Sequence, residues 1–288
     1  MPIRIVQSKQ NSRLKDLRRA LAQPGRGGSS LAGVEGPKLL EEALRAGLRI
    51  PTVFVAQGAE HLLEGLALPE ETEVLLLPKE LLDSALATET PQPVAALVEP
   101  PTWSWADMLG GAEKARPLIV VLAGLQDPGN LGTILRSAEA FGACGVLSLP
   151  GSVSEWNPKA VRASAGSVFR LPLLAVSAQD CFARLRKAGV KIWTTTADGA
   201  EAADRIDLAG PVALLIGNEG NGVPRELAKQ ADGAVTIPCP GPVESLNAAA
   251  AASVLLYEAS RQRTACVSHP SQSARRMGHP DSLTRSVR

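Results

Sequence analysis

The chain has 288 residues, of which 45% are hydrophobic and 20% are charged, and its formal net charge is +1. This length exceeds a typical domain of roughly 100 to 200 residues, so two domains or one large domain are expected. The composition excludes disordered, collagen-like and fibrous proteins. Because aromatic residues make up only 3%, any nucleic-acid binding should depend on charge and shape, not on stacked rings.

The cysteines and histidines form neither a disulfide framework nor a zinc-binding pattern. Cys144, Cys181, Cys239 and Cys266 are scattered without a C-x-x-C pair, and the chain has three histidines. We therefore expect no metal. The amino terminus has no continuous apolar segment, and no apolar stretch is long enough to cross a bilayer. These features predict a reducing, cytoplasmic location without membrane insertion.

The small net charge averages over segments of opposite sign. Residues 1–30 carry seven basic residues against Asp16 alone, and residues 261–288 carry six arginines against Asp281 alone. Residues 60–90 are strongly acidic. Basic ends are typical of phosphate-binding surfaces, and an acidic segment repels phosphate, but simple solvated tails explain the same pattern.

The first third of the chain predicts a small α/β unit that ends near residue 98. Leucines at helical spacing and a helix that opens with Pro37 and closes with Gly47 support this interpretation. Residues 99–117, rich in proline and glycine and without a regular period, predict a linker. In chain order the predicted elements are helix 12–22, helix 37–47, strand 51–57, strand 73–78, helix 78–86 and strand 94–99.

From Leu118 to residue 263, apolar strands alternate with helices, which predicts a mostly parallel sheet with helices on both faces. The tail, residues 264–288, is rich in serine and arginine and is predicted to be disordered. The predicted strands are 118–124, 144–150, 168–176, 191–196, 211–217 and 234–238, and the predicted helices are 130–143, 157–166, 178–188, 224–230 and 245–263.

Three polar, glycine-bearing junctions follow predicted strands, where open α/β sheets bind ligands. The first junction follows the strand 118–124 and leads to Asn130, which is expected to cap a helix, and to Arg136. The second follows the strand 211–217 and contains Glu219. The third follows the strand 234–238 and contains Ser245 and Asn247. Neither G-x-x-x-x-G-K-[ST] nor a G-x-G-x-x-G at a strand-to-helix junction is present, which disfavours kinases, NTPases and dinucleotide-dependent dehydrogenases. Each junction alone is also explained by ordinary helix caps and turns.

Together, in order and spacing, the junctions resemble the motifs of the SpoU (TrmH-type) family of SPOUT RNA ribose 2′-O-methyltransferases. Residues 130–142 are similar to N-x-G-x-x-x-R-x-A-x-x-F-G, residues 217–222 to GNEGxG, and residues 237–247 to IPxxGxxxSLN. The resemblance covers residues 118–263. It extends more weakly to residues 10–98, where LAGVEGPKLLEEAL is similar to an RNA substrate-binding domain that resembles a ribosomal RNA-binding protein.

The resemblance implies an α/β fold whose mostly parallel sheet ends in a carboxy-terminal trefoil knot, and a homodimer that binds S-adenosyl-L-methionine in the knot. Gly217, Ile237 and Leu246 match positions whose backbones hold this cofactor, and Thr195 is a weaker candidate. Core packing is the alternative role for Ile237 and Leu246, and the two roles are compatible. Cys239 stands where a methionine is common in the family, and we expect it to be a small buried hydrophobe.

The resemblance also implies that Arg136, Asn130, Glu219, Ser245 and Asn247 form the catalytic site. The family assigns activation of the ribose hydroxyl to the arginine. Because a guanidinium stays protonated, we interpret Arg136 as stabilising developing negative charge and gripping the adjacent phosphate. Asn130 and Ser245 are expected to contact ribose or phosphate, and Glu219 and Asn247 to hold the loops and Arg136 in place. For Glu219, a loop carboxylate that only accepts backbone amides is an equal alternative to a direct catalytic part.

The predicted function is S-adenosylmethionine-dependent methyl transfer to a ribose 2′-hydroxyl of structured RNA, with ribosomal RNA favoured by the amino-terminal unit. Transfer RNA is the main alternative substrate. A catalytically silent RNA-binding assembly protein is a second alternative, and the intact motif residues argue against it. An unrelated α/β oxidoreductase is disfavoured by the missing glycine fingerprint.

Overall fold

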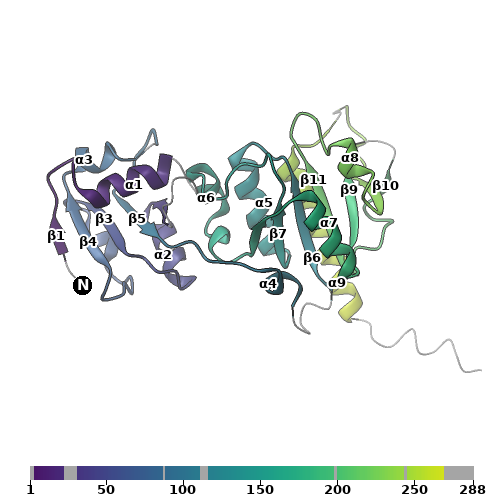
Figure 1. Ribbon diagram of the computed structural model, residues 1–288, viewed down its shortest axis with the longest axis horizontal. Helices are drawn as coiled ribbons and strands as arrows, with labels where there is room; N and C mark the ends of the chain where they lie inside the picture. Colours follow the sequence, from purple (N-terminus) through teal and green to yellow (C-terminus); the bar gives the residue numbers. More distant parts are fainter. Residues whose placement is uncertain are drawn as a thin grey trace, which may run out of the picture.

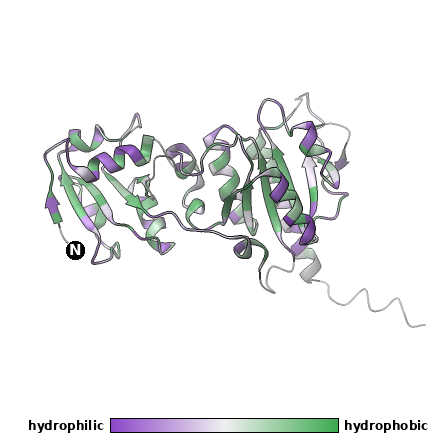
Figure 2. Cartoon of the chain, in the orientation of Figure 1, coloured by the Kyte–Doolittle hydropathy of each residue, from purple (hydrophilic) through white to green (hydrophobic). Residues whose placement is uncertain are grey.

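The computed structural model contains two α/β units that lie end to end along the longest axis of the molecule (Figure 1). We call residues 3–98 the amino-terminal unit and residues 118–268 the carboxy-terminal unit. Hydrophobic residues concentrate on the strands of both units, as Figure 2 shows. The residues that the structure describes are 3–22, 31–86, 88–110, 116–197, 200–242 and 245–268.

The amino-terminal unit is built on a five-stranded sheet of order β1-β4-β3-β5-β2. Strands β1, β4 and β3 are parallel, whereas β5 is antiparallel to both β3 and β2. Side chains alternate along β3, so Val53 and Val55 share one core with α2, and Phe54 shares another with α1 and α3. The elements are β1 (Ile3–Ile5), α1 (Ser12–Ala22), β2 (Ala32–Glu35), α2 (Pro37–Arg45), β3 (Thr52–Ala56), η1 (Glu60–Leu63), β4 (Glu73–Leu77), α3 (Lys79–Asp83) and β5 (Val94–Val98).

The predicted helices and strands of this unit are all present, but the sequence does not predict β1 and β2. The first is three exposed residues that pair with β4. The second contains Gly33, where a Cβ would lie 2.7 Å from the side chain of Leu21. Such short strands depend on pairing and on close packing with distant residues, which local propensity does not reveal.

The carboxy-terminal unit has a seven-stranded sheet of order β10-β12-β9-β11-β6-β7-β8, and all its pairings are parallel. Helices α5, α6 and α9 share a core on one face, and α7 covers the other face. The predicted two-sided parallel sheet is therefore confirmed. The elements are β6 (Leu118–Ala123), α5 (Pro128–Ala140), β7 (Gly145–Ser148), α6 (Pro158–Ser164), η3 (Ser167–Phe169), β8 (Leu173–Ala175), α7 (Ala178–Lys187), β9 (Lys191–Thr195), β10 (Glu201–Ala202), β11 (Val212–Gly217), α8 (Arg225–Ala228), β12 (Gly233–Thr236) and α9 (Ala248–Ser268).

Several details differ from the sequence prediction, including the two-residue strand β10, which it does not predict. The segment expected to be an irregular linker contains a short helix, α4 (Trp105–Leu109), because Met108 is buried in the core beneath α7. The strand predicted over 168–176 is shortened to β8, since η3 occupies its first part. Helix α9 continues to Ser268, beyond the predicted start of the disordered tail. Residues 269–288 lie outside the described residues, and the trefoil knot stays a prediction.

The close contact of α5 with α6 depends on Gly132. A Cβ at this position would lie 2.5 Å from Cβ of Ala163 and 2.8 Å from the backbone nitrogen of Ser164. The neighbouring backbone cannot move aside without shifting α6. The small residue therefore sets the distance between the two helices.

We predict that Gly132→Ala lowers the free energy of unfolding. Overpacking costs up to about 3 kcal/mol, against a gain of about 1 kcal/mol in helix propensity, so a net loss of about 1–2 kcal/mol is expected. Urea unfolding followed by circular dichroism measures it. Gly241→Ala is the matched control, because a Cβ there meets nothing within 4 Å. Equal stability of the two variants would contradict the prediction.

Candidate functional site

The three polar junctions meet at one edge of the carboxy-terminal sheet. Strands β6 and β11 are parallel neighbours, with Ala123 opposite Gly217 at their carboxyl ends. The segments that follow them therefore leave the sheet side by side. The amide of Asn218 joins them, because its Nδ2 donates to the carbonyl oxygen of Gly124 over 2.9 Å.

Glu219 fastens the second junction to the first. Its carboxylate accepts hydrogen bonds from the backbone nitrogens of Gln126 (3.2 Å) and Asp127 (3.0 Å) and from Nδ2 of Asn130 (3.0 Å). Burial alone would raise the pKa of Glu219, but these hydrogen bonds outweigh it, and the pKa lies below its ordinary value. The carboxyl group is thus ionised at neutral pH.

Asn130 extends this connection to the third junction. Its Oδ1 accepts a hydrogen bond of 3.0 Å from Nδ2 of Asn247. The Oδ1 of Asn247 in turn accepts from the backbone nitrogens of Ala249 (2.9 Å) and Ala250 (3.2 Å), so this residue caps α9. Glu219, Asn130 and Asn247 thus form one hydrogen-bonded chain that links three segments distant in the sequence. We call it the polar chain.

The expectation that Asn130 caps α5 is wrong, because Asp127 does so. Asp127 accepts from the backbone nitrogen of Asn130 over 2.8 Å, and Pro128 occupies the first helical position. The Nζ of Lys159 lies 3.0 Å from Asp127, and that bond, with the backbone amides, lowers the pKa of the aspartate. The Asp-Pro pair is a recognisable start signal for a helix, but no local pattern connects Lys159 to it.

Beside the polar chain lies a cavity of about 880 Å³. All four residues expected to hold the cofactor line it, and so do Glu219 and Ser245 of the expected catalytic group. Gly217 permits the close approach of its own loop, since a Cβ there would lie 2.5 Å from the carbonyl oxygen of Gly222. The four residues are Thr195, Gly217, Ile237 and Leu246.

The side chains that line this cavity differ in their environment. Ile237 is half-buried and packs against the core, whereas Leu246 is 38% exposed, which is high for an aliphatic side chain and does not fit a purely core role. The hydroxyl of Thr195 donates to the carbonyl oxygen of Leu215 over 3.0 Å. Cys239, expected to be buried, is exposed at the cavity lining, because its loop lies outside the sheet.

Arg136 and Ser245 stand apart from the polar chain. Both are exposed, and neither side chain has a hydrogen bond or ion pair with the residues that the structure describes. Arg136 lies on α5 beyond Asn130 and is absent from the cavity lining. None of the five N–H donors of its guanidinium is therefore taken up by a described residue.

Within the described ranges, no group of three or more His, Cys, Asp or Glu side chains is arranged to hold a metal ion. Likewise, none of the helices in the described part of the chain has the length and hydropathy needed to span a membrane.

Comparison with known proteins identifies the class to which this fold and site belong. The profile of the SpoU rRNA Methylase family matches residues 117–257, and that of the MRM3-like substrate binding domain matches residues 11–96. The chain therefore belongs to the SpoU rRNA methylase family, as its motifs predict.

Individual relatives support the same assignment. A protein named uncharacterized tRNA/rRNA methyltransferase, from Mycolicibacterium vanbaalenii, is 37% identical over 231 residues, covering 77% of this chain and 74% of the relative. The 23S rRNA (guanosine(2553)-2′-O)-methyltransferase RlmP of Bacillus subtilis is 29% identical, covering 88% of this chain and 97% of that protein. The crystal structure of the SpoU methyltransferase AviRb from Streptomyces viridochromogenes, in complex with the cofactor AdoMet, is similar with a TM-score of 0.77 and 31% identity, covering 88% of this chain and 99% of that one.

We predict that the stabilising effect of Glu219 depends on pH. A carboxyl group with a lowered pKa in the folded state contributes stability above its unfolded pKa, and the contribution is lost as pH falls through the folded pKa. Glu219→Gln should therefore be less stable than wild type at pH 7, and the difference should shrink below about pH 4.5. Urea unfolding at a series of pH values tests this. A difference that stays constant with pH would contradict it.

Proposed function

We propose that this protein transfers a methyl group from S-adenosyl-L-methionine to a ribose 2′-hydroxyl of ribosomal RNA. The observation that carries the proposal is the polar chain of Glu219, Asn130 and Asn247 at the rim of a cavity with an exposed aliphatic side chain. Membership of the SpoU rRNA methylase family supports it, as does the name of the related RlmP, a 23S rRNA 2′-O-methyltransferase.

The cavity fits the proposed cofactor in size and in chemistry. About 880 Å³ lies within the range of roughly 300 to 1,000 Å³ common to small-molecule sites. Leu246 and Ile237 offer apolar surface to an adenine ring, and Gly217 lets the ligand approach the backbone closely. Thr195 lies at the end of β9 and completes this wall. We assign these four residues to cofactor binding.

When bound, S-adenosyl-L-methionine supplies an electrophilic methyl group on a sulfonium. The protein must then hold the ribose hydroxyl in line with that methyl and stabilise the charge that develops on oxygen. We assign the second task to Arg136, whose guanidinium is unpaired among the described residues and also suits an adjacent phosphate. Asn130 and Ser245 contact ribose or phosphate in this scheme. Glu219 acts mainly by holding loops, since its lone pairs are engaged by amides.

The amino-terminal unit supplies the RNA-binding surface in this proposal. It matches a substrate-binding domain, and α1 presents Arg13, Lys15, Arg18 and Arg19. Arg13 and Arg19 are in ion pairs, with Glu73 and Asp16, so their charges are partly neutralised. Lys15 is exposed and its side chain is unpaired among the described residues. It is therefore the cation of this helix that is most available to phosphate.

We also propose a homodimer that acts in the cytoplasm. On α9, Val254 is 43% exposed and Tyr257 is 55% exposed, and Tyr257 packs edge-on against Phe141, the residue that follows α5. A second copy of this face would cover these apolar side chains and lie close to α5, the helix that carries Arg136. The location follows from the substrate, because the bacterial relative RlmP is named for 23S rRNA.

We predict that Arg136→Ala lowers methyl transfer by at least about 100-fold, the usual effect of losing a group that stabilises developing charge. Cofactor affinity should be unchanged, because Arg136 does not line the cavity. The measurement is transfer of tritium from labelled S-adenosylmethionine to total ribosomal and transfer RNA, separated by size. Arg225→Ala, at an exposed arginine on α8, is the matched control.

Each result of that experiment has a defined meaning. Label in ribosomal RNA that is lost only in Arg136→Ala supports both the substrate and the residue. Label in transfer RNA supports the proposed methyl transfer but shows that transfer RNA, and not ribosomal RNA, is the substrate. Near-normal turnover of Arg136→Ala overturns its role, and cofactor binding without any label favours an assembly intermediate as substrate or a silent relative.

We predict that Lys15→Glu weakens RNA binding, with a larger loss at low salt than at high salt. Each phosphate contact contributes about one unit to the slope of log affinity against log salt, so the slope should fall by about one. Filter binding across a salt series measures both quantities. Lys191→Glu, exposed at the amino end of β9 and so at the opposite sheet edge from the cavity, serves as control. An unchanged slope for Lys15→Glu would mean that α1 is only a solvated helix.

A further inference from the structure

Two segments of opposite charge face each other where the two units meet. The carboxy-terminal unit contributes Arg162 on α6 and Arg170 after η3, and the amino-terminal unit contributes Glu35 on β2 and Glu42 on α2. Helix α6 lies between the units in Figure 1 and contacts β2. The contact is therefore specified by charge as well as by shape.

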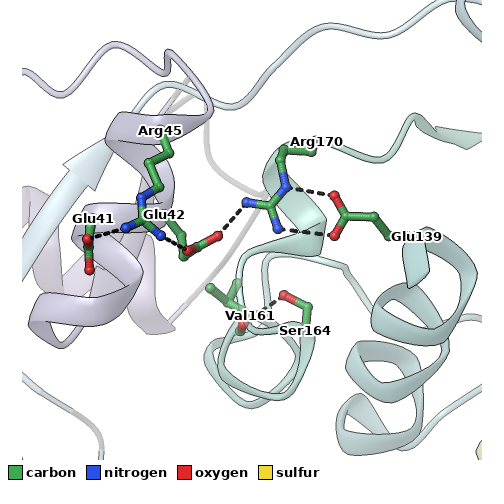
Figure 3. A network of polar contacts seen from close by, with 7 residues as sticks. All are labelled: Glu41, Glu42, Arg45, Glu139, Val161, Ser164 and Arg170. Atoms are coloured by element: carbon green, nitrogen blue, oxygen red, sulfur yellow. Dashed lines mark hydrogen bonds and ion pairs between the residues drawn. The ribbon is translucent and has the colours of Figure 1, made fainter.

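Arg170 is the centre of this contact, as Figure 3 shows. Its Nη1 donates to Glu42 Oε2 over 2.5 Å, while Nε and Nη2 donate to the two carboxylate oxygens of Glu139 over 2.6 and 3.1 Å. The bonds to Arg170 lower the pKa of Glu139, and those from Glu139 and Glu42 raise the pKa of Arg170. One guanidinium thus joins α2 of one unit to α5 of the other.

The backbone before Arg170 is shaped for this close approach. Ala165 and Gly166 both have left-handed conformations, with φ of 49° and 91°. A Cβ on Gly166 would lie 2.7 Å from Cβ of Glu42. The turn therefore presses directly against α2, and a side chain at residue 166 would push the units apart.

A second ion pair lies beside the first. Arg162 Nη1 is 3.8 Å from Glu35 Oε2, and the Glu35 side chain is only 3% exposed. The other oxygen of Glu35 accepts from Thr88 Oγ1 over 2.7 Å and from the backbone nitrogen of Gln92 over 3.0 Å. Hydrogen bonds within the amino-terminal unit thus fix the side chain of Glu35 independently of its contact with Arg162. Together with a hydrophobic core that includes residues of both units, the two pairs define one relative orientation.

The helix reached by Arg170 is the one that carries two of the proposed catalytic residues. Glu139 lies one turn after Arg136 on α5, and Asn130 lies in the first turn of the same helix. Arg170 therefore couples a displacement of α2 directly to α5, alongside the shared core and the pair of Arg162 and Glu35. Partly exposed ion pairs contribute little to the free energy of unfolding. This bridge therefore serves mainly to fix orientation, because the guanidinium of Arg170 binds both carboxylate oxygens of Glu139 in a defined geometry.

We propose that Arg170 is a positioning residue that fixes the orientation of the amino-terminal unit relative to α5, and so sets where a bound RNA presents its ribose to Arg136. This inference rests on the proposed function. It requires that loss of the ion pair between Arg170 and Glu42 lowers the turnover of bound RNA, while the affinities for cofactor and for RNA stay the same. Misplacement of reacting groups by about 1 Å can cost 100-fold, and one of two ion pairs remains, so about a tenfold loss of kcat is expected.

Glu42→Gln is the informative variant, and Glu41→Gln is its matched control. Both residues lie on α2 and pair with Arg45 of the same helix, over 2.6 Å for Glu41 and 3.1 Å for Glu42, but among the described residues Glu41 has no ion pair across to the other unit. Kinetics with saturating RNA should give about tenfold lower kcat for Glu42→Gln, with KM near wild type, and wild-type values for Glu41→Gln. Adding Arg170→Met to Glu42→Gln should cost less than Arg170→Met costs alone, because the two residues act through one contact.

Orientation is measured independently of activity. Double electron–electron resonance between spin-labelled noncanonical residues at Gln57 and Lys187, one in each unit, should give a broadened distance distribution for Glu42→Gln and a wild-type distribution for Glu41→Gln. Equal distributions and equal kcat in the two variants would overturn the positioning role, and a change in KM alone would overturn it in favour of direct RNA contact. A wild-type protein that transfers no methyl group to free RNA or to ribosomal assembly intermediates would refute the proposed function, and the distance measurement would still decide the role of Arg170.

Discussion

The carboxylate of Glu219 is the group on which the geometry of the site depends. It is held ionised by amide donors from the segment after β6 and is attached to the loop after β11, so it joins two loops that the sheet brings only to the same edge. Through Asn130 the same charge reaches Asn247 and the start of α9. Without it, the three segments would keep only the bond of Asn218 to Gly124 and that of Asn247 to Asn130, and exposed loops gain little further hold from apolar packing.

In this arrangement the residues that hold the loops together differ from those proposed to act on the substrate. The polar chain consumes the hydrogen-bonding capacity of Glu219 and much of that of Asn130, whereas the side chains of Arg136 and Ser245 have no partner among the described residues and are proposed to contact the substrate. A reaction that needs an oriented hydroxyl and a stabilised oxygen charge is served by such a site without a histidine. The cavity beside it, with its glycine and aliphatic lining, suits a flat and largely apolar ligand group.

Charged side chains that link segments distant in the sequence also define the contact between the two units. Arg162 forms an ion pair with Glu35 on β2, and Arg170 forms one with Glu42 on α2. The hydrophobic core continues beneath both pairs. RNA specificity and methyl transfer are proposed to reside in different units, so their relative orientation has to be defined by the protein itself. Helix α5 is the element on which both requirements meet, since it carries the proposed catalytic arginine and also Glu139.

The sequence by itself determined the alternation of strands and helices, the family, and six of the residues that line the cavity, because apolar periodicity and motif spacing are local properties of a chain. Local signals were insufficient for β1 and β2, for α4 beneath α7 and for the exposure of Cys239, since pairing and burial are decided by distant neighbours. They also assigned the cap of α5 to Asn130, although Asp127 holds it. Only the tertiary structure decided that Glu219, Asn130 and Asn247 form one chain and that Arg170 joins the two units, because these partners are separated by tens of residues and meet only when parallel strands and packed helices bring them together.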